Sequence, residues 1–308
     1  MKIIFFGSDD FAGTHLTALL ASGYKVLACV TQPDRPQGRG MKLAVSPIKE
    51  IAQSNNIPYL QPPTLKDEHV VDALKKFNAD IFVVVAYGCL LTPAVLNIPP
   101  KGCINVHGSL LPYYRGAAPI NWAIINGEKE TGVTIQQMVY ELDAGDIISQ
   151  EVLPILPTTT AVTLREDMAQ AGAKLLIQTL GQIAANKQVF IKQDKAKVSV
   201  ASKLTKELGR INWDESAVII ERKIRGLKPW PGCFTLYQGK ILKVHEANLI
   251  DVKAKPAGVI AVDKTGITVG CSGGALKLIT VQPEGGKPMS AYQWALGYKI
   301  EVGSTFGE

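Results

Sequence analysis

Apolar runs alternate with helix-like segments through the first half of the chain, and this alternation constrains the fold most strongly. The runs are KIIFFG (2–7), KVLACVT (25–31) and ADIFVVVAY (79–87). Helical periodicity covers 10–22, 45–56 and 67–77. Buried strands that are joined by helices form parallel sheets with right-handed crossovers. The sequence therefore predicts an α/β fold whose first domain is built on a Rossmann-like parallel sheet.

The pattern changes near residue 190, which predicts a second domain. A long amphipathic helix is expected over 163–186, followed by a polar, Lys-rich stretch over 187–207. Another helix is expected over 214–227, and short alternating strands with glycine turns over 232–303 favour a small β-barrel. We expect an α/β domain over 1–190, a basic linker over 191–207 and an OB-like β-barrel domain over 208–308.

The positive charge is concentrated in the second part of the chain. Residues 1–190 carry 15 Lys and Arg against 16 Asp and Glu, whereas residues 191–308 carry 18 against 11, a net +7. A basic domain beside a neutral one indicates a polyanion such as a nucleic acid as its partner. Solubility alone also explains such a charge.

Several features indicate a cytoplasmic protein without a membrane partner. No apolar run reaches the roughly 18 residues that a membrane helix needs. The N-terminal MKIIFFGSDDF meets a glycine and two acids after its apolar run, which is typical of a first strand rather than a signal peptide. The five cysteines show no CxxC spacing, which favours free thiols in a reducing compartment.

The stretch GCINVHGSLLP (102–112) places Asn105 and His107 at alternating positions, on one face of a predicted strand. Asp143 follows later in ELDAGDII, within a glycine-containing turn that can return to the edge of the sheet. A carboxylate favours the charged form of an imidazole, and an amide can donate to a developing oxyanion. The three residues suit the addition of a nucleophile to a carbonyl. In the alternative interpretation the histidine is structural, and Asp143 with Asp146 merely caps a turn.

Other motifs are incomplete or open to two interpretations. Gly7 follows the first strand without the further glycines of a dinucleotide-binding turn. No Ser or Cys is placed as in a nucleophile elbow, and the HExxH pattern is absent from the sequence. The loop TQPDRPQGRGMK (31–42) is either a solvated loop or a phosphate-binding loop that uses Arg35, Arg39 and Lys42.

Four segments together closely resemble the methionyl-tRNA formyltransferase family. They are INVHGSLLPYYRGAAPI (104–120), TGVTIQQMVYELDAGDII (131–148), TQPDRPQGRG (31–40) and GRINWDESAVIIERKIRGLKPWPG (209–232), and the resemblance covers nearly the whole chain. The Asn-x-His signature with a distant Asp is shared by the wider 10-formyltetrahydrofolate-dependent transferases. The RGAAPI stretch, the basic loop and the second domain point to the tRNA-specific member. One departure is GSDDF at 7–11, where relatives usually have Thr-Pro before Asp-Phe.

The resemblance implies a role for each matching position. Asn105, His107 and Asp143 match the catalytic trio, which acts without a metal on 10-formyltetrahydrofolate as the formyl-donor cosubstrate. The matching folate contacts are Ser109, Leu110, Leu111 and Pro112, with Tyr87, Gly88, Cys89 and Leu90 as the wall that receives the pterin. Methionyl-initiator-tRNA is the implied partner, with Arg39 entering its acceptor stem. The other expected tRNA-binding residues are Arg35, Lys42, Lys203, Lys206 and Arg210. We expect the protein to act as a monomer.

Three alternatives differ from this interpretation in testable ways. A glycinamide-ribonucleotide or amino-sugar formyltransferase uses the same trio but lacks a basic barrel. A nicotinamide-dependent oxidoreductase needs the glycine set that Gly7 does not complete. An RNA-binding protein without catalytic activity leaves the Asn105, His107 and Asp143 arrangement without a purpose.

Overall fold

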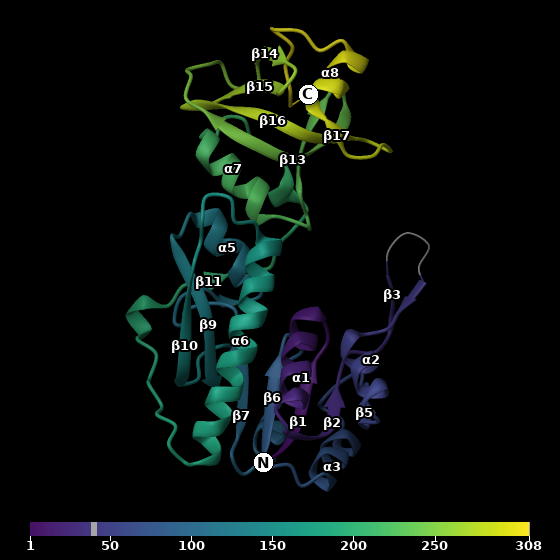
Figure 1. Cartoon of the computed structure of the whole chain (residues 1–308), viewed down its shortest axis with the longest axis vertical. Helices are drawn as coiled ribbons and strands as arrows, with labels where there is room; N and C mark the ends of the chain where they lie inside the picture. The colour runs from purple at the N-terminus through teal and green to yellow at the C-terminus, as the bar shows by residue number, and fades with distance from the viewer. Residues whose placement is uncertain (38–41, 308) are drawn as a thin grey trace. The chain divides into compact units, whose positions relative to one another are not determined.

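A computed structural model describes residues 1–37 and 42–307, and the chain forms two compact units (Figure 1). Unit 1 comprises Met1–Pro119, Glu130–Pro154 and Arg165–Ala201. Unit 2 comprises Ile120–Lys129, Ile155–Leu164 and Ser202–Glu308. Among the described residues, no helix has the length and apolar character to cross a membrane.

Unit 1 is built on a seven-stranded sheet in the order β10-β9-β7-β6-β1-β2-β5. Its strands are β1 (Lys2–Gly7), β2 (Lys25–Val30), β5 (Tyr59–Leu60), β6 (Ile81–Val85), β7 (Cys103–His107), β9 (Glu130–Gln137) and β10 (Ile147–Pro154). The five strands from β7 to β5 are mutually parallel, which confirms the predicted parallel sheet. Strand β9 runs antiparallel to both of its neighbours, β7 and the edge strand β10, which the sequence did not predict. The connection between β9 and β10, 138–146, is shorter than the dozen or so residues that a parallel crossover needs.

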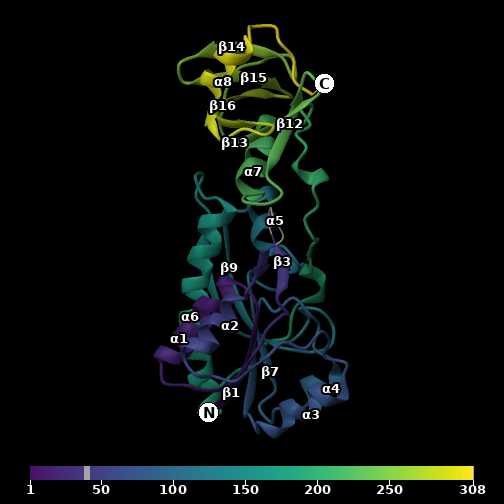
Figure 2. The ribbon, with the colours of Figure 1, turned by 90° about the vertical axis from the view of Figure 1, so that its right-hand side faces the viewer.

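The predicted helices of unit 1 are confirmed, and side-chain caps start three of them. The helices are α1 (Asp10–Ala21), α2 (Pro47–Ser54), α3 (Glu68–Lys76), α4 (Pro93–Leu96) and α6 (Ala161–Ala184). Asp9, Ser46 and Asp67 each accept a backbone N–H of the first turn of α1, α2 and α3, which satisfies donors that a helix start leaves free. Figure 2 shows α1, α2 and α6 on one face of the sheet and α3 and α4 on the other. Short α4 was not predicted, because four residues carry too little periodicity.

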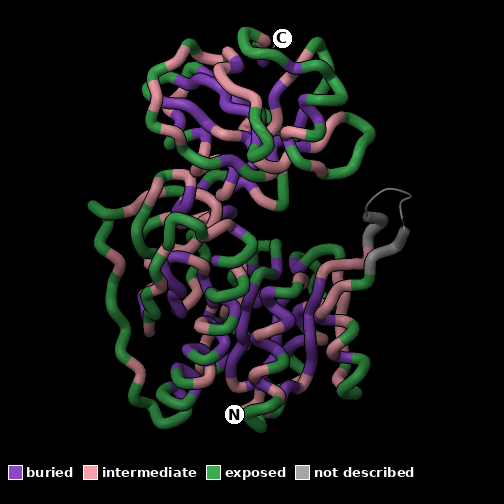
Figure 3. Tube along the Cα trace, turned by 45° about the horizontal axis from the view of Figure 1, so that its top comes forward, coloured by how far each residue is buried: buried purple, intermediate pink, exposed green. Residues whose placement is uncertain are grey.

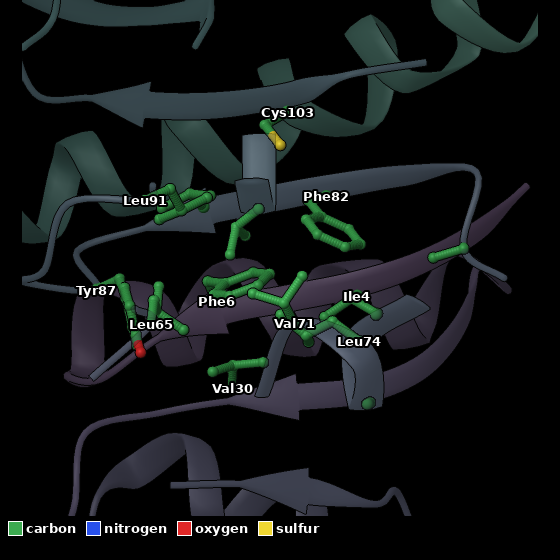
Figure 4. Packing of buried hydrophobic residues seen from close by; sticks show 14 residues of the cluster. Ile4, Phe6, Val30, Leu65, Val71, Leu74, Phe82, Tyr87, Leu91 and Cys103 are labelled. Carbon is green, nitrogen blue, oxygen red and sulfur yellow. The ribbon is translucent and has the colours of Figure 1, made fainter. Parts of the chain in front are cut away.

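The central strands of unit 1 are buried, as the apolar runs predict (Figure 3). On the face covered by α3 and α4, the aromatic rings of Phe6, Phe82 and Tyr87 pack together (Figure 4). The ring centroids of Phe6 and Phe82 are 5.3 Å apart, and Tyr87 meets Phe6 edge-on at 5.5 Å. Buried aromatic pairs of this kind hold the C-terminal ends of β1 and β6 in place. Those ends carry the segments where a ligand site of an α/β sheet is expected.

Short elements complete unit 1. Strands β3 (Arg35–Gln37) and β4 (Lys42–Ala44) form an antiparallel hairpin, which projects past α2 in Figure 1. Strand β8 (Arg115–Gly116) pairs in parallel with β11 (Val200–Ala201), which lies within the segment expected to be a linker. A 3-10 turn, η1 (Lys195–Lys197), precedes β11. Part of the Lys-rich stretch is therefore bound to the β8 segment of unit 1 through backbone hydrogen bonds.

Unit 2 is a six-stranded antiparallel sheet in the order β12-β13-β16-β15-β14, with β17 paired to β16. Its elements are η2 (Glu207–Gly209), α7 (Ala217–Gly226), β12 (Cys233–Tyr237), β13 (Lys240–Ile250), β14 (Val259–Asp263), β15 (Gly266–Cys271), β16 (Gly274–Pro283), β17 (Met289–Ser290) and α8 (Ala291–Tyr298). The C-terminal residues 303–307 bridge the two outer strands. The Gly307 N–H donates to the Leu236 carbonyl of β12, the Gly303 N–H donates to the Val259 carbonyl of β14, and the Val259 N–H donates to the Ser304 carbonyl. These bonds close the sheet, as the predicted barrel requires.

The prediction that strands fill 232–303 was wrong at α8. The spacing of Ala291, Trp294 and Ala295 is helical, and all three side chains are buried. The Trp294 ring packs edge-on against Tyr237. The helical spacing was missed because the segment is short and glycines lie on both sides of it.

Two early segments of the sequence belong to unit 2, which the sequence did not predict. One contains helix α5 (Pro119–Asn126), where the Asn121 side chain donates to the Gly226 carbonyl at 2.7 Å and Trp122 donates to the Ser202 carbonyl at 2.8 Å. The other contains Thr159, whose carbonyl accepts from the Arg225 guanidinium at 2.7 Å. These hydrogen bonds join residues far apart in sequence, so local patterns cannot reveal them.

Candidate functional site

Strands β7 and β9 place four polar side chains on one face of unit 1. Asn105 and His107 alternate along β7, and the antiparallel register sets Asn105 opposite Gln136 and His107 opposite Thr134. His107, Thr134 and Gln136 are buried. The Asn105 side-chain amide is only partly buried and makes no hydrogen bond to any described residue. An amide in this state is available to a ligand.

Asp143 comes to the same face from the loop after β9. Its Oδ1 lies 3.6 Å from His107 Nδ1, and the two side chains are 9% and 7% exposed. Oδ2 accepts the Gly116 N–H at 2.9 Å, and Oδ1 accepts the Gln136 amide at 3.0 Å. The structure therefore brings together the three residues that the sequence singled out.

The His107 ring has an oxygen acceptor near each nitrogen. Nε2 lies 2.9 Å from the Tyr114 carbonyl, while Nδ1 faces the Asp143 carboxylate. Only a doubly protonated ring supplies a donor to both oxygens. An oxyanion therefore gains a direct N–H bond from this ring only when one of these acceptors gives way.

Residues outside the predicted set hold the Asp143 loop. Asp143 has a φ of 51°, in the left-handed region that non-glycine residues rarely occupy. The Gln193 side chain donates to the carbonyls of Asp143 and Gly145, at 2.8 and 2.7 Å, and its oxygen accepts from Arg115. Gln193 lies fifty residues downstream, so no local pattern in the sequence points to it. Gln136, by contrast, follows from alternation along TGVTIQQ.

The predicted folate segment 109–112 forms a tightly bonded turn after β7. The Ser109 hydroxyl donates to the Tyr113 carbonyl at 2.6 Å, and the Leu111 N–H donates to Thr134 Oγ1 at 3.1 Å. Ser109, Leu111 and Pro112 are buried, Leu110 is half-buried, and the Leu111–Pro112 peptide is cis. The Ser109 hydroxyl is thus engaged within the protein, and the segment offers mainly Leu110 and backbone to a ligand.

The predicted pterin wall follows β6 and divides into an anchor and an exposed part. The Tyr87 side chain is buried in the aromatic cluster, and burial raises the pKa of its hydroxyl. The Tyr87 carbonyl accepts from the Ser8 hydroxyl at 3.1 Å, which fixes the start of the segment. Gly88, Cys89 and Leu90 are exposed, and Leu90 is 61% exposed. An exposed leucine that lines one cavity with Asp143 suits contact with the face of a flat ring.

Two cavities flank the segment 138–140. The smaller, of about 30 Å³, is lined by Leu90, Leu91, Gln136 and residues 138–143. The larger, of about 820 Å³, is lined by Pro93, Leu96, Asn97, Pro99, Pro100, Lys101, Gly102, Gln137, Met138, Val139, Tyr140, Asn186, Gln188 and Phe190. Asn105, His107 and Asp143 do not line the larger cavity, so cavity size alone would point away from this polar cluster. Asp143 and Leu90 of the exposed wall both line the smaller cavity.

The predicted tRNA-binding residues fall into three groups. Arg39 lies outside the described residues, and Arg35 and Lys42 belong to strands β3 and β4. The third group consists of Lys203, Lys206 and Arg210, which are exposed in unit 2 and make no side-chain hydrogen bond or ion pair with the described residues. Free exposed cations are what phosphate contact requires.

Within the part of the chain that the structure describes, no group of three or more His, Cys, Asp or Glu side chains could hold a metal ion.

Gly7 has a packing role: a Cβ at this position would lie 2.6 Å from the Ala12 Cβ and 2.8 Å from the Phe5 ring. That close approach explains the glycine without a dinucleotide.

Comparisons with known proteins show the family of the chain. Residues 1–180 match the formyl transferase family, and residues 203–299 match the formyl transferase C-terminal domain. The chain is 43% identical over 306 residues to the methionyl-tRNA formyltransferase of Caldanaerobacter subterraneus subsp. tengcongensis, covering 99% of each protein. It is 41% identical to the methionyl-tRNA formyltransferase of Geobacter sulfurreducens, covering 100% of this chain and 97% of that protein.

Solved structures share the fold at lower identity. An N-formyltransferase from Helicobacter canadensis, in complex with folinic acid and dTDP-3-aminofucose, superposes with a TM-score of 0.69 at 19% identity, covering 90% of this chain and 98% of that one. HypX from Aquifex aeolicus, in complex with tetrahydrofolic acid, gives a TM-score of 0.68 at 16% identity, covering 98% of this chain and 48% of that one.

Proposed function

The chain belongs to the formyl transferase family, and on that premise we propose that it transfers the formyl group of 10-formyltetrahydrofolate to the amino group of methionyl-initiator-tRNA. The observation that carries the proposal is the identity of 41–43% to methionyl-tRNA formyltransferases over the full length of both units. The matched length includes the basic second unit of this chain as well as the first unit. The product, N-formylmethionyl-tRNA, serves translation initiation, so the protein acts in the cytoplasm.

Asn105, His107 and Asp143 provide the chemistry of this transfer. The uncharged amine of the aminoacyl group attacks the formyl carbon, a C–N bond forms, and negative charge develops on the formyl oxygen. The free Asn105 amide is the donor for that oxygen, and the imidazolium of His107 stabilises the charge electrostatically. The bond from the formyl carbon to N10 of the folate then breaks, and the proton lost by the amine ends on N10.

Asp143 has two roles in this scheme. It maintains the charge of His107, and it accepts the proton of the attacking amine directly or through a water. The free α-amino group has an ordinary pKa of about 7.7–8.0, so a base is needed at neutral pH. The exposed wall Gly88–Leu90 and Leu110 contact the folate, which places N10 near the trio.

Positively charged side chains make the tRNA contacts. Lys203, Lys206 and Arg210 bind phosphates, and Arg35, Lys42 and Arg39 of the basic loop act at the acceptor stem. Phosphate contacts do not distinguish one tRNA from another. Arg39 distinguishes initiator tRNA from other tRNAs by entering an acceptor stem whose end opens at a low cost in free energy. The protein acts as a monomer in this scheme.

Formyl transfer to charged initiator tRNA tests the proposal, with Asn105→Ala and His107→Ala as inactive controls. Each is expected to lower kcat by about 10²–10³-fold, the usual cost of an oxyanion donor. Arg39→Ala is expected to raise KM for methionyl-tRNA while folinic acid binding is unchanged. Transfer to glycinamide ribonucleotide or to a dTDP-amino sugar, with none to methionyl-tRNA, would replace this function by the rival acceptor.

A further inference from the structure

Gln136 lies beside the catalytic trio, and the mechanism above gives it no role. It occupies β9 directly opposite Asn105, and its side chain is buried, with 2% of the residue exposed. Opposite residues of antiparallel strands have Cβ atoms about 4.5–5.5 Å apart. A buried glutamine in this position requires partners for both ends of its amide.

The two ends of the Gln136 amide have different surroundings. Nε2 donates to Asp143 Oδ1 at 3.0 Å, and the same oxygen lies 3.6 Å from His107 Nδ1. Because an ionised carboxylate only accepts, the amide must turn its NH₂ to Asp143, and this fixes the direction of its oxygen. Oε1 is buried and has no hydrogen-bond partner among the described residues. A buried acceptor without a donor is costly in free energy.

The position of Gln136 relates this unpaired oxygen to the ligand site. Gln136 lines the cavity of about 30 Å³ together with Leu90 and Asp143. Leu90 belongs to the wall expected to receive the pterin, and Asp143 belongs to the trio. The reduced pteridine ring of the formyl donor carries several N–H donors and needs acceptors on the protein.

We propose that Gln136 is a positioning residue with a second role in donor binding. Its Nε2 holds Asp143 Oδ1 toward His107, and its Oε1 accepts a hydrogen bond from an N–H of the bound pteridine ring. The inference rests on the proposed function, because it takes 10-formyltetrahydrofolate as the donor. One side chain thereby couples the seating of the donor to the orientation of the catalytic carboxylate.

Two substitutions separate these roles. Gln136→Leu removes the donor and the acceptor, so kcat is expected to fall about 10- to 100-fold, the usual cost of losing a hydrogen bond to a charged group. Folinic acid, measured by calorimetry, is expected to bind about tenfold more weakly to this variant. Gln136→Glu keeps an acceptor but places a second carboxylate beside Asp143.

The Gln136→Glu variant has a signature in pH that packing alone does not produce. Two adjacent carboxyl groups cannot both ionise freely, so the pKa of the pair is raised. Below that pKa the shared proton restores a donor between the two groups. The kcat of this variant, relative to wild type, is therefore expected to be low at pH 8 and to recover as the pH falls. Its binding of folinic acid at low pH is expected to stay near that of the wild type.

Gln137→Leu is the matched control, because Gln137 is the next residue of β9, faces the other side and lines the larger cavity. Wild-type kcat and folinic acid affinity are expected for it, and melting curves establish that all three variants fold. Wild-type kcat in Gln136→Leu, where Asn105→Ala is inactive, would overturn the inference and leave the function standing. Equal losses in both Gln136 variants at every pH would reduce Gln136 to packing. If methionyl-tRNA is not the acceptor, the proposed function fails, while calorimetry with folinic acid still decides the role of Gln136.

Discussion

Acidification is expected to destabilise unit 1 through His15 of helix α1. The ring is fully buried, its Nδ1–H donates to the Phe11 carbonyl at 2.7 Å, and Nε2 has no partner among the described residues. A Cβ on Gly172 would lie 2.7 Å from Nε2, which shows how little space surrounds the ring. Burial, opposed by the Phe11 hydrogen bond and assisted by the charge of Arg165, lowers the pKa of His15 from 6.5 to about 4.

The sign and size of the effect follow from linkage. Below pH 6.5 the unfolded chain takes up a proton at His15, while the folded chain stays neutral until about pH 4. The contribution of the neutral His15 ring to the free energy of unfolding is therefore fully present above pH 6.5, and it is lost as the pH decreases from 6.5 to about 4. The loss is about 2 kcal/mol at pH 5, and it levels off at about 3 kcal/mol below pH 4.

The assay must follow α1 itself. All four tryptophans lie in unit 2, so their fluorescence does not follow unit 1. Hydrogen exchange of peptides from Asp10–Ala21 in urea, corrected for intrinsic rates, gives the opening free energy at pH 7.5 and 5.0. His15→Leu is expected to remove about 2 kcal/mol of the pH dependence, whereas His69→Leu at an exposed position of α3 leaves it unchanged. An equal loss in wild type and His15→Leu, or an NMR pKa of His15 near 6.5, would refute the reasoning.

Two further predictions concern the site. Burial raises the pKa of four cysteines, Cys29, Cys103, Cys233 and Cys271, to about 12, while Cys89 is exposed. A thiol reagent is therefore expected to label one cysteine per native chain and none in Cys89→Ser. Folinic acid is expected to block this labelling. Gly116 has a φ of 113°, its N–H donates to Asp143, and a Cβ would lie 2.7 Å from the Ala201 carbonyl. Gly116→Ala is expected to lower kcat about 10- to 100-fold by displacing that carboxylate, with Gly285→Ala, a positive-φ glycine in open space, as the unaffected control.

The sequence predicts those parts of the fold that local chemistry decides. The apolar run at 2–7 matches β1 residue for residue, and Ser46 caps α2 as its neighbour Pro47 indicates. Asn105 and His107 were predictable as a pair because strand alternation puts them on one face, and Asp143 because its motif resembles a known family.

Long-range pairing decides the remainder, and the sequence gives little access to it. Gln193 reaches the Asp143 loop across fifty residues, and Asn121 meets Gly226 across more than a hundred. The antiparallel pairing of β9 with β7 sets Gln136 opposite Asn105 and Thr134 opposite His107, and that register depends on strand pairing rather than on composition. The network that orients the trio is therefore less visible in sequence than the trio itself.

Gly145 offers the sharpest test of whether backbone packing sets the catalytic geometry. It is two residues after Asp143, and a Cβ there would lie 1.6 Å from the Gln137 carbonyl oxygen. The contact is with backbone at the end of β9, so relief requires the loop to move. A shift of about 1 Å at Asp143 is enough to cost roughly 10²-fold in rate.

Gly145→Ala is accordingly expected to lose kcat by about that factor while both units remain folded. Gly181→Ala is the matched control, because Gly181 is an exposed residue of α6 with open space around its Cα, where alanine is expected to stabilise the helix by about 0.5–1 kcal/mol. A second substitution at Gln137 is not expected to restore activity, because the atom that a Cβ on residue 145 would meet is the backbone oxygen of Gln137, which every residue carries. Wild-type kcat in Gly145→Ala would mean that the loop yields without moving Asp143, and the carboxylate would then owe its position to the hydrogen bonds from Gln136, Gly116 and Gln193.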